Sequence, residues 1–111
     1  ALISYVDADG RYRLNNRAYE TWFGRPREEL LGRHVREVLG EAAWAAVRPH
    51  LETALAGTAS ACELEVPDRN GGTRWVAATY TPDVGPGGTV RGLVAHVHDV
   101  TARRQTEEAL R

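Results

Sequence analysis

The sequence predicts an α+β domain in which helices cover one face of a single antiparallel sheet. Three observations predict this fold class. Two short segments rich in β-forming residues open the chain and flank a turn. Several helical patterns then extend to Gly57, where the spacing of apolar residues changes from about 3.6 to about 2. Helices between the second and third strands of a hairpin-linked sheet are expected to gather on one of its faces.

The first two strands are expected at residues 2–6 and 11–14. The first contains consecutive β-forming residues, and the second alternates polar and apolar side chains, as a half-buried strand does. Residues 7–10, Asp-Ala-Asp-Gly, are typical of a turn in which Gly10 adopts a positive φ. The two segments are therefore predicted to pair as a hairpin.

Four helical segments are expected between the second and third strands. Asn16 can cap the first of them, and Pro26 suits the first turn of the second. Gly57 is expected to end the last and longest. Pro49 lies inside that helix and cannot donate a hydrogen bond, so we expect a break or kink near Arg48. The four segments are residues 17–23, 26–31, 35–39 and 41–56.

Three more strands are expected after Gly57, and a helix follows them. Residues 67–72 are rich in turn-forming residues and predict a hairpin connection. Residues 82–89 predict a glycine- and proline-rich loop. Thr101 can cap the final helix, residues 102–111, whose side chains are mostly polar. The three strands are residues 61–66, 73–81 and 90–100.

Composition excludes several classes of function. The 111 residues provide one core, and the 14 basic and 15 acidic residues balance, so neither nucleic acid nor a membrane surface is an expected partner. Every basic residue is arginine, which excludes lysine chemistry such as a Schiff base. The single cysteine excludes an internal disulfide and indicates a reducing, cytoplasmic compartment. The chain shows neither a signal peptide nor a membrane span and contains no Met, so we expect a segment of a longer protein.

Taken together, these features resemble a PAS domain over nearly the whole chain. The most specific motif is Asp99-Val100-Thr101 followed by a charged helix. It is similar to the Asp-Ile-Thr signature that joins a PAS core to its signalling helix. The other motifs, in order along the chain, are YVDADG at residues 5–10, NRAY at 16–19, WFG at 22–24, REELLGR at 27–33, ALAG at 54–57 and RWV at 74–76.

The resemblance implies a five-stranded antiparallel sheet of order 2-1-5-4-3, with a PAS sensor domain at residues 1–101 and the start of a signalling helix at residues 102–111. It also implies a pocket for a small organic ligand between the inner face of the sheet and the helices. PAS domains sense ligands or dimerise within sensor histidine kinases, diguanylate cyclases or transcription regulators. The exit motif is most similar to a histidine kinase linker, so we expect a C-terminal effector of that kind.

Two cofactors of PAS subfamilies find little support in the sequence. Flavin photoreceptors of the light-oxygen-voltage type carry a cysteine in an Asn-Cys-Arg motif on a helix, whereas Cys62 lies in a predicted strand, so flavin is disfavoured. Haem-binding PAS domains use a histidine on the long helix, and His50 is the one candidate. His50 follows Pro49 directly and lies at the edge of the apolar stripe. We therefore favour a partly exposed helix histidine, and the cofactor stays unknown.

Side-chain alternation predicts which residues face the pocket. Ala78 and Ala95 are small and lie on neighbouring strands, which leaves space for a ligand. The alternative is that Trp22 or Trp44 fills that space and no ligand binds. Candidate hydroxyl groups for a ligand are those of Tyr5, Tyr19 and Tyr80. The candidate pocket residues are Tyr19, Phe23, Val35, Leu39, Trp44, Val47, His50, Leu51, Cys62, Leu64, Val76, Ala78, Tyr80, Leu93, Ala95 and Val97.

The outer face of the sheet is predicted to bind a partner. An apolar patch on a sheet face usually indicates a missing partner, and a second copy of the chain or an N-terminal flank could cover it. His96 and His98 share one face of the last strand, but no third ligand is near, so we predict no metal site. The predicted outer-face residues are Trp75, Ala77, Thr79, Val94 and His96.

The sequence thus predicts a cytoplasmic sensory module that binds a small ligand, forms a homodimer, or does both. The alternative is a pure dimerisation module with a filled core. No nucleophile–base pair is visible, so we expect no catalysis in this segment. A small enzyme or ligand carrier of the same α+β outline would need a histidine–acid pair beside an open cleft.

Overall fold

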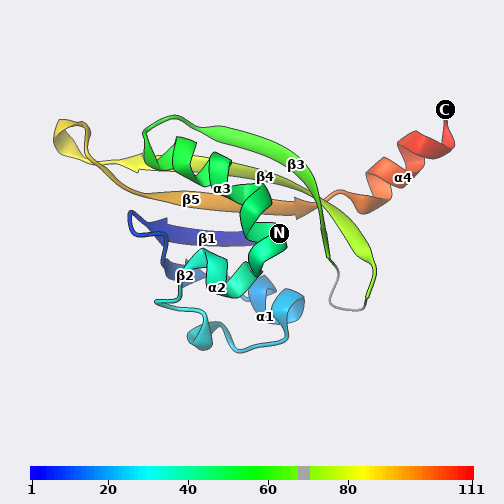
Figure 1. Ribbon diagram of the computed structural model, residues 1–111, viewed down its shortest axis with the longest axis horizontal. Helices are drawn as coiled ribbons and strands as arrows, with labels where there is room; N and C mark the ends of the chain where they lie inside the picture. The colour runs from blue at the N-terminus through cyan, green and yellow to red at the C-terminus, as the bar shows by residue number, and fades with distance from the viewer. Residues whose placement is uncertain (68–70) are drawn as a thin grey trace.

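The computed structural model describes residues 1–67 and 71–111, and its five strands form one antiparallel sheet (Figure 1). The strands are β1 (Leu2–Asp7), β2 (Tyr12–Asn15), β3 (Ser60–Pro67), β4 (Thr73–Val84) and β5 (Val90–Asp99). Their order across the sheet is β2-β1-β5-β4-β3, which confirms the predicted fold class and strand order. The connection predicted at residues 67–72 lies in part outside the described residues.

Asp7 holds the turn between β1 and β2. Its Oδ1 accepts hydrogen bonds from the amides of Asp9 at 2.9 Å and Arg11 at 3.0 Å, and its Oδ2 accepts one from Arg13 Nε at 2.6 Å. Burial raises the pKa of Asp7, but these donors outweigh it and the pKa is lowered. Gly10 completes the turn with a φ of +79°, a conformation that costs glycine little.

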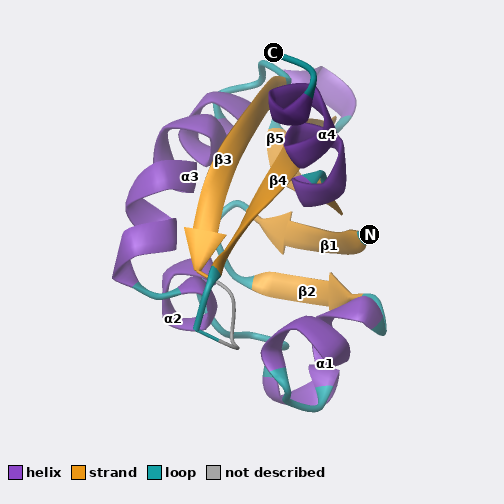
Figure 2. Ribbon diagram, turned by 90° about the vertical axis from the view of Figure 1, so that its right-hand side faces the viewer, coloured by secondary structure: helices purple, strands orange, loops and turns teal. Residues whose placement is uncertain are grey.

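Three helices pack on the inner face of the sheet: α1 (Ala18–Phe23), α2 (Val35–Leu39) and α3 (Glu41–Leu55). A 3₁₀ turn at Arg27–Glu29 lies between α1 and α2. Figure 2 shows α2 and α3 on one side of the strands, with the C-terminal helix α4 (Thr101–Ala109) on the other side. The inner face is thus enclosed by helices, whereas the outer face is covered by α4 at one end.

Two local predictions in the helical region, the Asn16 cap and the break near Arg48, are wrong. Asn16 does not cap α1, because its side chain instead accepts a hydrogen bond from Ile3 N at 3.1 Å and donates one to Ala1 O at 3.0 Å. The helix does not break near Arg48, and α3 continues through Pro49. Pro49 and the residue four positions before it are exposed, so water can bond the carbonyl that loses its helical partner.

Strand β4 is longer than predicted. Residues 82–84, which were expected in a loop, continue to pair with β5, and Pro82 stands opposite Leu93. The pairing of β3 ends opposite Tyr80, so β4 is an edge strand beyond that point. Proline is tolerated on an edge strand because its missing amide need not serve a second neighbour.

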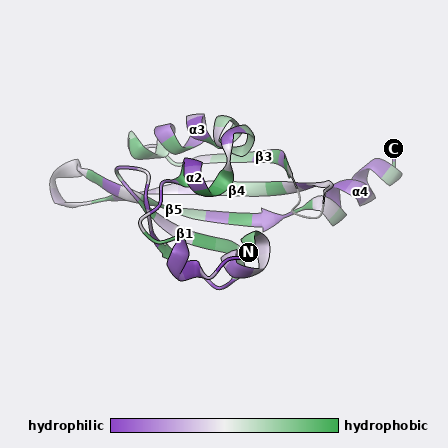
Figure 3. Cartoon of the chain, turned by 60° about the horizontal axis from the view of Figure 1, so that its bottom comes forward, coloured by the Kyte–Doolittle hydropathy of each residue, from purple (hydrophilic) through white to green (hydrophobic). Residues whose placement is uncertain are grey.

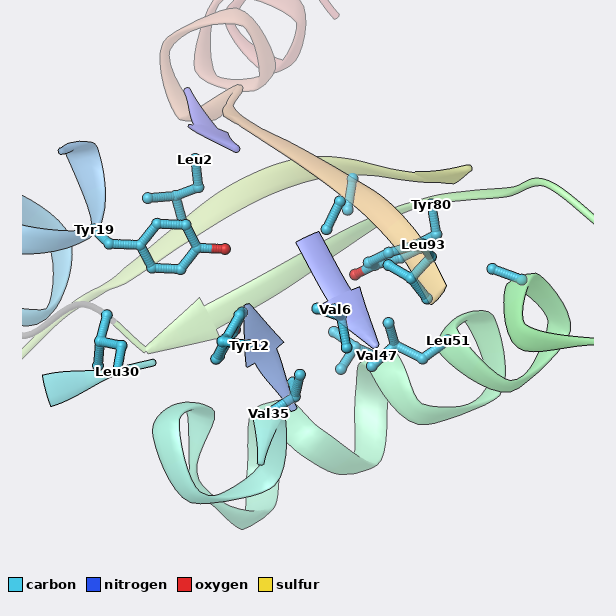
Figure 4. Close-up of a cluster of buried hydrophobic side chains, with 13 residues drawn as sticks. Leu2, Val6, Tyr12, Tyr19, Leu30, Val35, Val47, Leu51, Tyr80 and Leu93 are labelled. Carbon is cyan, nitrogen blue, oxygen red and sulfur yellow. The ribbon is translucent and has the colours of Figure 1, made fainter. Parts of the chain in front are cut away.

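The core lies between the inner face of the sheet and the three helices (Figure 4). Leu30 and Leu93 have no exposed surface, and the aromatic rings of Tyr12, Tyr19 and Phe23 pack in series with centroids 5.6 Å apart. Figure 3 shows hydrophobic residues along the strands, whereas α4 is mostly hydrophilic. The central strands are therefore fixed by burial, and α4 must be held by polar contacts.

Candidate functional site

A cavity of about 330 Å³ lies between the inner face of the sheet and the helices. Its walls are mostly apolar, and Trp22 lines it without filling it. The predicted pocket residues that line it are Tyr19, Phe23, Val35, Leu39, Val47, Leu51, Leu64, Val76, Ala78, Tyr80, Ala95 and Val97. The lining residues that were not predicted are Leu2, Ser4, Val6, Tyr12, Trp22, Val38, Ala43, Val66 and Arg74.

Four residues predicted for the pocket are not part of its lining. Leu93 is fully buried in the core, and Trp44 packs edge-on against His34 with ring centroids 5.1 Å apart. Cys62 lies in β3, where burial raises the pKa of its thiol. His50 Nδ1 is 2.9 Å from the Ser60 hydroxyl, outside the cavity lining. His50, the candidate haem ligand, is therefore not among the residues that line the cavity.

Polar groups gather at the part of the cavity formed by β1, β2 and α1. Ser4 and Asn15 stand opposite each other in the β1–β2 ladder, and they are 1 % and 5 % exposed. The Ser4 hydroxyl and both polar atoms of the Asn15 amide lack a well-aligned hydrogen bond. Burial raises the pKa of Tyr19, although contacts of its hydroxyl with Ser4, Tyr12 and Asn15 oppose the rise. This polar cluster therefore consists of four uncharged side chains.

Tyr12 of this cluster and Tyr80 also bear on the chemistry of the site. Burial is the main cause that raises the pKa of both Tyr12 and Tyr80, so these phenols stay neutral at physiological pH. In Figure 4 the hydroxyls of Tyr19 and Tyr80 point into the interior from opposite sides. Tyr5, a predicted hydroxyl source, instead faces the outer side and donates to Asp83 Oδ2 at 2.6 Å.

One charged side chain lines the cavity within the described residues, and it belongs to Arg74. Its guanidinium lies over the Trp22 ring, 4.8 Å from the centroid, and pairs with Asp99 at 3.3 Å. Arg74 and Tyr80 are six positions apart along β4, about 20 Å between their Cα atoms, and Tyr80 lies in the same row of the sheet as Ser4. The Arg74 guanidinium nevertheless reaches Trp22 of α1, the helix that also carries Tyr19.

The motif Asp99-Val100-Thr101 joins the sheet to α4. Val100 N donates to Trp75 O, and Trp75 N donates to the Thr101 hydroxyl, both at 2.8 Å. Thr101 N in turn donates to Asp99 Oδ1 at 2.8 Å. The Thr101 side chain thus binds β4, and the prediction that it caps α4 is wrong.

Glu63 on the outer face of β3 contacts α4. It pairs with Arg103 at 2.8 Å and with Arg104 at 3.2 Å, and these hydrogen bonds lower the pKa of its carboxyl. Both strands that hold α4, β3 and β4, also line the cavity through Leu64 and Val76. The cavity and the exit helix therefore share the same two strands.

The outer face carries the residues predicted for it. Val94 is 42 % exposed and shares this face with two exposed residues of β1 and β2, Ile3 and Leu14. His96 and His98 lie edge-on to each other with ring centroids 4.1 Å apart. Over residues 1–67 and 71–111, no three His, Cys, Asp or Glu side chains are grouped so as to hold a metal ion. None of the helices within these ranges has both the length and the apolar character to cross a membrane.

A sheet of this order, with helices enclosing a cavity on one face and a helix leaving from the fifth strand, defines the class of PAS sensory domains. The chain belongs to the PAS fold family, whose sequence model matches residues 1–105. No curated protein matches the chain.

Solved structures support the fold. The PAS domain of a protein from Colwellia psychrerythraea is 20 % identical with a TM-score of 0.74, covering 92 % of this chain and 87 % of that one. A sensory box histidine kinase from Vibrio cholerae is 21 % identical with a TM-score of 0.74, covering 90 % and 81 %. Drosophila melanogaster Cycle PAS-B with bound ethylene glycol is 12 % identical with a TM-score of 0.71, covering 89 % and 99 %.

Proposed function

We propose that this PAS module binds a small organic ligand in the cavity and relays its presence through α4 to a C-terminal effector. The observation that carries the proposal is the cavity of about 330 Å³, which is apolar over most of its wall and polar at a few places. Ligand sites in proteins share this character. Residues 1–101 would sense the ligand, and residues 102–111 would begin the connection to the effector.

The shared strands suggest how the relay works. A ligand against Leu64 and Val76 contacts the inner side of β3 and β4, whereas Glu63 and Trp75 hold α4 from the outer side. Because neighbouring residues of a strand point to opposite faces, a shift in either strand moves both sets of contacts. The ligand would act by binding two arrangements of these strands and α4 unequally.

We propose a histidine kinase as the effector and the cytoplasm as the location. The exit motif Asp99-Val100-Thr101 followed by the charged α4 supports the first point, and so does the likeness to a Vibrio cholerae sensor histidine kinase. The single free cysteine, Cys62, supports the second, because it suits a reducing compartment.

Binding can be tested with a neutral fluorescent dye, N-phenyl-1-naphthylamine, together with native mass spectrometry. We expect the chain to enhance the dye fluorescence or to carry an extra mass that denaturation releases. Ala78→Leu, which adds volume inside the cavity, should reduce dye binding at least about tenfold, whereas Ala46→Leu on the exposed side of α3 should not. Absence of both dye binding and extra mass would contradict the proposal.

A second candidate function is homodimerisation through the outer face. Ile3, Leu14 and Val94 are 40 %, 53 % and 42 % exposed, and they lie on neighbouring strands. Exposed apolar patches of this kind often bind a partner. A pure dimerisation module whose core is filled is disfavoured, because neither Trp22 nor Trp44 occupies the cavity.

Analytical ultracentrifugation tests dimerisation. We expect a dimer for the native chain and a monomer for Val94→Glu combined with Leu14→Glu. Leu31→Glu is a matched control, because Leu31 is 47 % exposed but lies outside the sheet. A native chain that stays monomeric at high concentration would contradict the candidate.

A further inference from the structure

Two side chains of the polar cluster, Ser4 and Asn15, lack a well-aligned hydrogen bond. Ser4 lines the cavity, is 1 % exposed, and its hydroxyl makes no well-aligned hydrogen bond. Asn15, beside it in the ladder, is 5 % exposed, and its amide contacts the Tyr19 hydroxyl without making a well-aligned hydrogen bond. A buried polar group without a partner is unfavourable, so this part of the cavity has unused capacity to bind a polar group.

The chemistry of the cluster limits what that polar group can be. Ser4, Tyr12 and Tyr19 present hydroxyls, each of which can donate and accept, and Asn15 presents an amide that does the same. None of these side chains is charged. A carboxylate or phosphate placed here would lose its hydration without gaining a cation, which is strongly unfavourable.

The cation that lines the cavity already has partners. The Arg74 guanidinium pairs with Asp99 at 3.3 Å and lies over the Trp22 ring, 4.8 Å from the centroid. The helices supply apolar walls through Val35, Leu39, Val47 and Leu51. An occupant would therefore meet neutral polar groups in the cluster and apolar walls elsewhere.

We propose that the cavity selects an uncharged ligand that has an apolar body and a single amide, carbonyl or hydroxyl group bound by Ser4, Tyr12 and Tyr19. Asn15 orients the Tyr19 hydroxyl and is a positioning residue. This inference rests on the proposed function, since it names the class of ligand for the same cavity.

Three probes of similar shape test the selection: 4-phenylbutanamide, 4-phenylbutanoate and n-pentylbenzene. Dissociation constants are measured by ligand-observed NMR on the native chain at neutral pH. We expect the amide to bind at least about 100-fold more tightly than the carboxylate, because only the latter buries a charge. Ser4→Ala should weaken amide binding by about 3- to 10-fold and leave pentylbenzene unchanged.

Thr81→Ala serves as the matched control, because Thr81 is exposed on β4 and does not line the cavity. Asn15→Leu should weaken the amide and not the hydrocarbon, which separates a positioning role from general damage. If amide and carboxylate bind equally and Ser4→Ala changes neither, the inference is overturned while the proposed function stands. If none of the three probes binds, the proposed function fails and the inference fails with it.

Discussion

The guanidinium carbon of Arg104 lies over the indole of Trp75, 3.5 Å from the ring centroid, and so joins the exit helix to β4. The same guanidinium contacts Glu63 on β3. Cation–π contacts at such distances are favourable, and an ion pair that shares the cation fixes its orientation. Because α4 has no buried residue, these contacts, the Arg103–Glu63 ion pair and the contacts of Thr101 decide whether it docks.

The first prediction concerns this docking. Arg104→Ala should speed amide hydrogen exchange in residues 101–109 by roughly 3- to 10-fold, since it removes the contacts with both Trp75 and Glu63. Glu107→Gln is the matched control, because the ion pair of Glu107 is with Arg103 inside α4. Hydrogen exchange read by mass spectrometry checks both variants. Equal exchange in the native chain and Arg104→Ala would contradict the role assigned to this residue.

The second prediction is that docking of α4 weakens in acid. Hydrogen bonds from Arg103 and Arg104 lower the pKa of Glu63. Burial raises the pKa of Asp99, but hydrogen bonds from Thr101 and the charge of Arg74 outweigh it, so this pKa is lowered too. A carboxyl with a lowered pKa stabilises the folded state above its ordinary pKa, and this stabilisation disappears as pH falls through the lowered value.

The midpoint temperature of thermal unfolding should therefore decrease once the pH is lower than about 4.5, because these carboxyls then begin to take up protons. Calorimetry between pH 3 and pH 7 on the native chain and on Glu63→Gln measures the effect. The two midpoints should differ most near pH 7 and converge near pH 3. A difference that is constant over the range would show that Glu63 does not act through its charge.

The third prediction concerns the close contact between Gly10, in the turn from β1 to β2, and His34, at the start of α2. A Cβ at Gly10 would lie 2.6 Å from His34 Nε2, and the φ of Gly10 is +79°. His34 is not free to leave, since its Nδ1 accepts from Arg36 N at 3.0 Å and its ring packs on Trp44. Gly10→Ala should therefore cost both backbone strain and a displaced histidine.

Gly32 offers the matched control, because its φ is +81° but nothing lies near its Cβ position. Gly32→Ala should lower the free energy of unfolding by about 1 kcal/mol, through strain alone. Gly10→Ala should lower it by about 2–3 kcal/mol. Urea unfolding of both variants is the measurement, and equal losses would show that His34 moves aside at no cost.

The elements and their order could be predicted from the sequence because each leaves a local signal. The period of 2 in residues 61–66 and the helical stripe from Trp44 to Leu55 depend only on neighbouring residues. The strand order leaves no such local signal, because β1 pairs with β5 from the other end of the chain. It was predicted from the resemblance to PAS domains, for which the motif around Asp99 is the most specific evidence.

The site was harder to predict, for a physical reason. Alternation shows that Ser4 and Val6 share a face, but it does not show which face is inner, and Tyr5 was assigned to the wrong one. Arg74 was missed because its charge suggests solvent, whereas its position in β4 places it beside Val66 in the cavity wall. Both outcomes depend on tertiary packing, which a single sequence does not report.

The last prediction tests the unpaired state of Ser4 without any ligand. The Ser4 hydroxyl is buried and has no well-aligned partner, so its removal deletes an unfavourable group and leaves the packing of the strand intact. Ser4→Ala should leave the free energy of unfolding unchanged or raise it by up to about 1 kcal/mol. Ser60→Ala is the contrasting variant, because the Ser60 hydroxyl lies 2.9 Å from His50 Nδ1 and its loss should cost about 1 kcal/mol. Urea unfolding at neutral pH compares the two variants. If Ser4→Ala lowers the free energy of unfolding as much as Ser60→Ala does, the Ser4 hydroxyl already has a partner, such as a buried water, in the free protein.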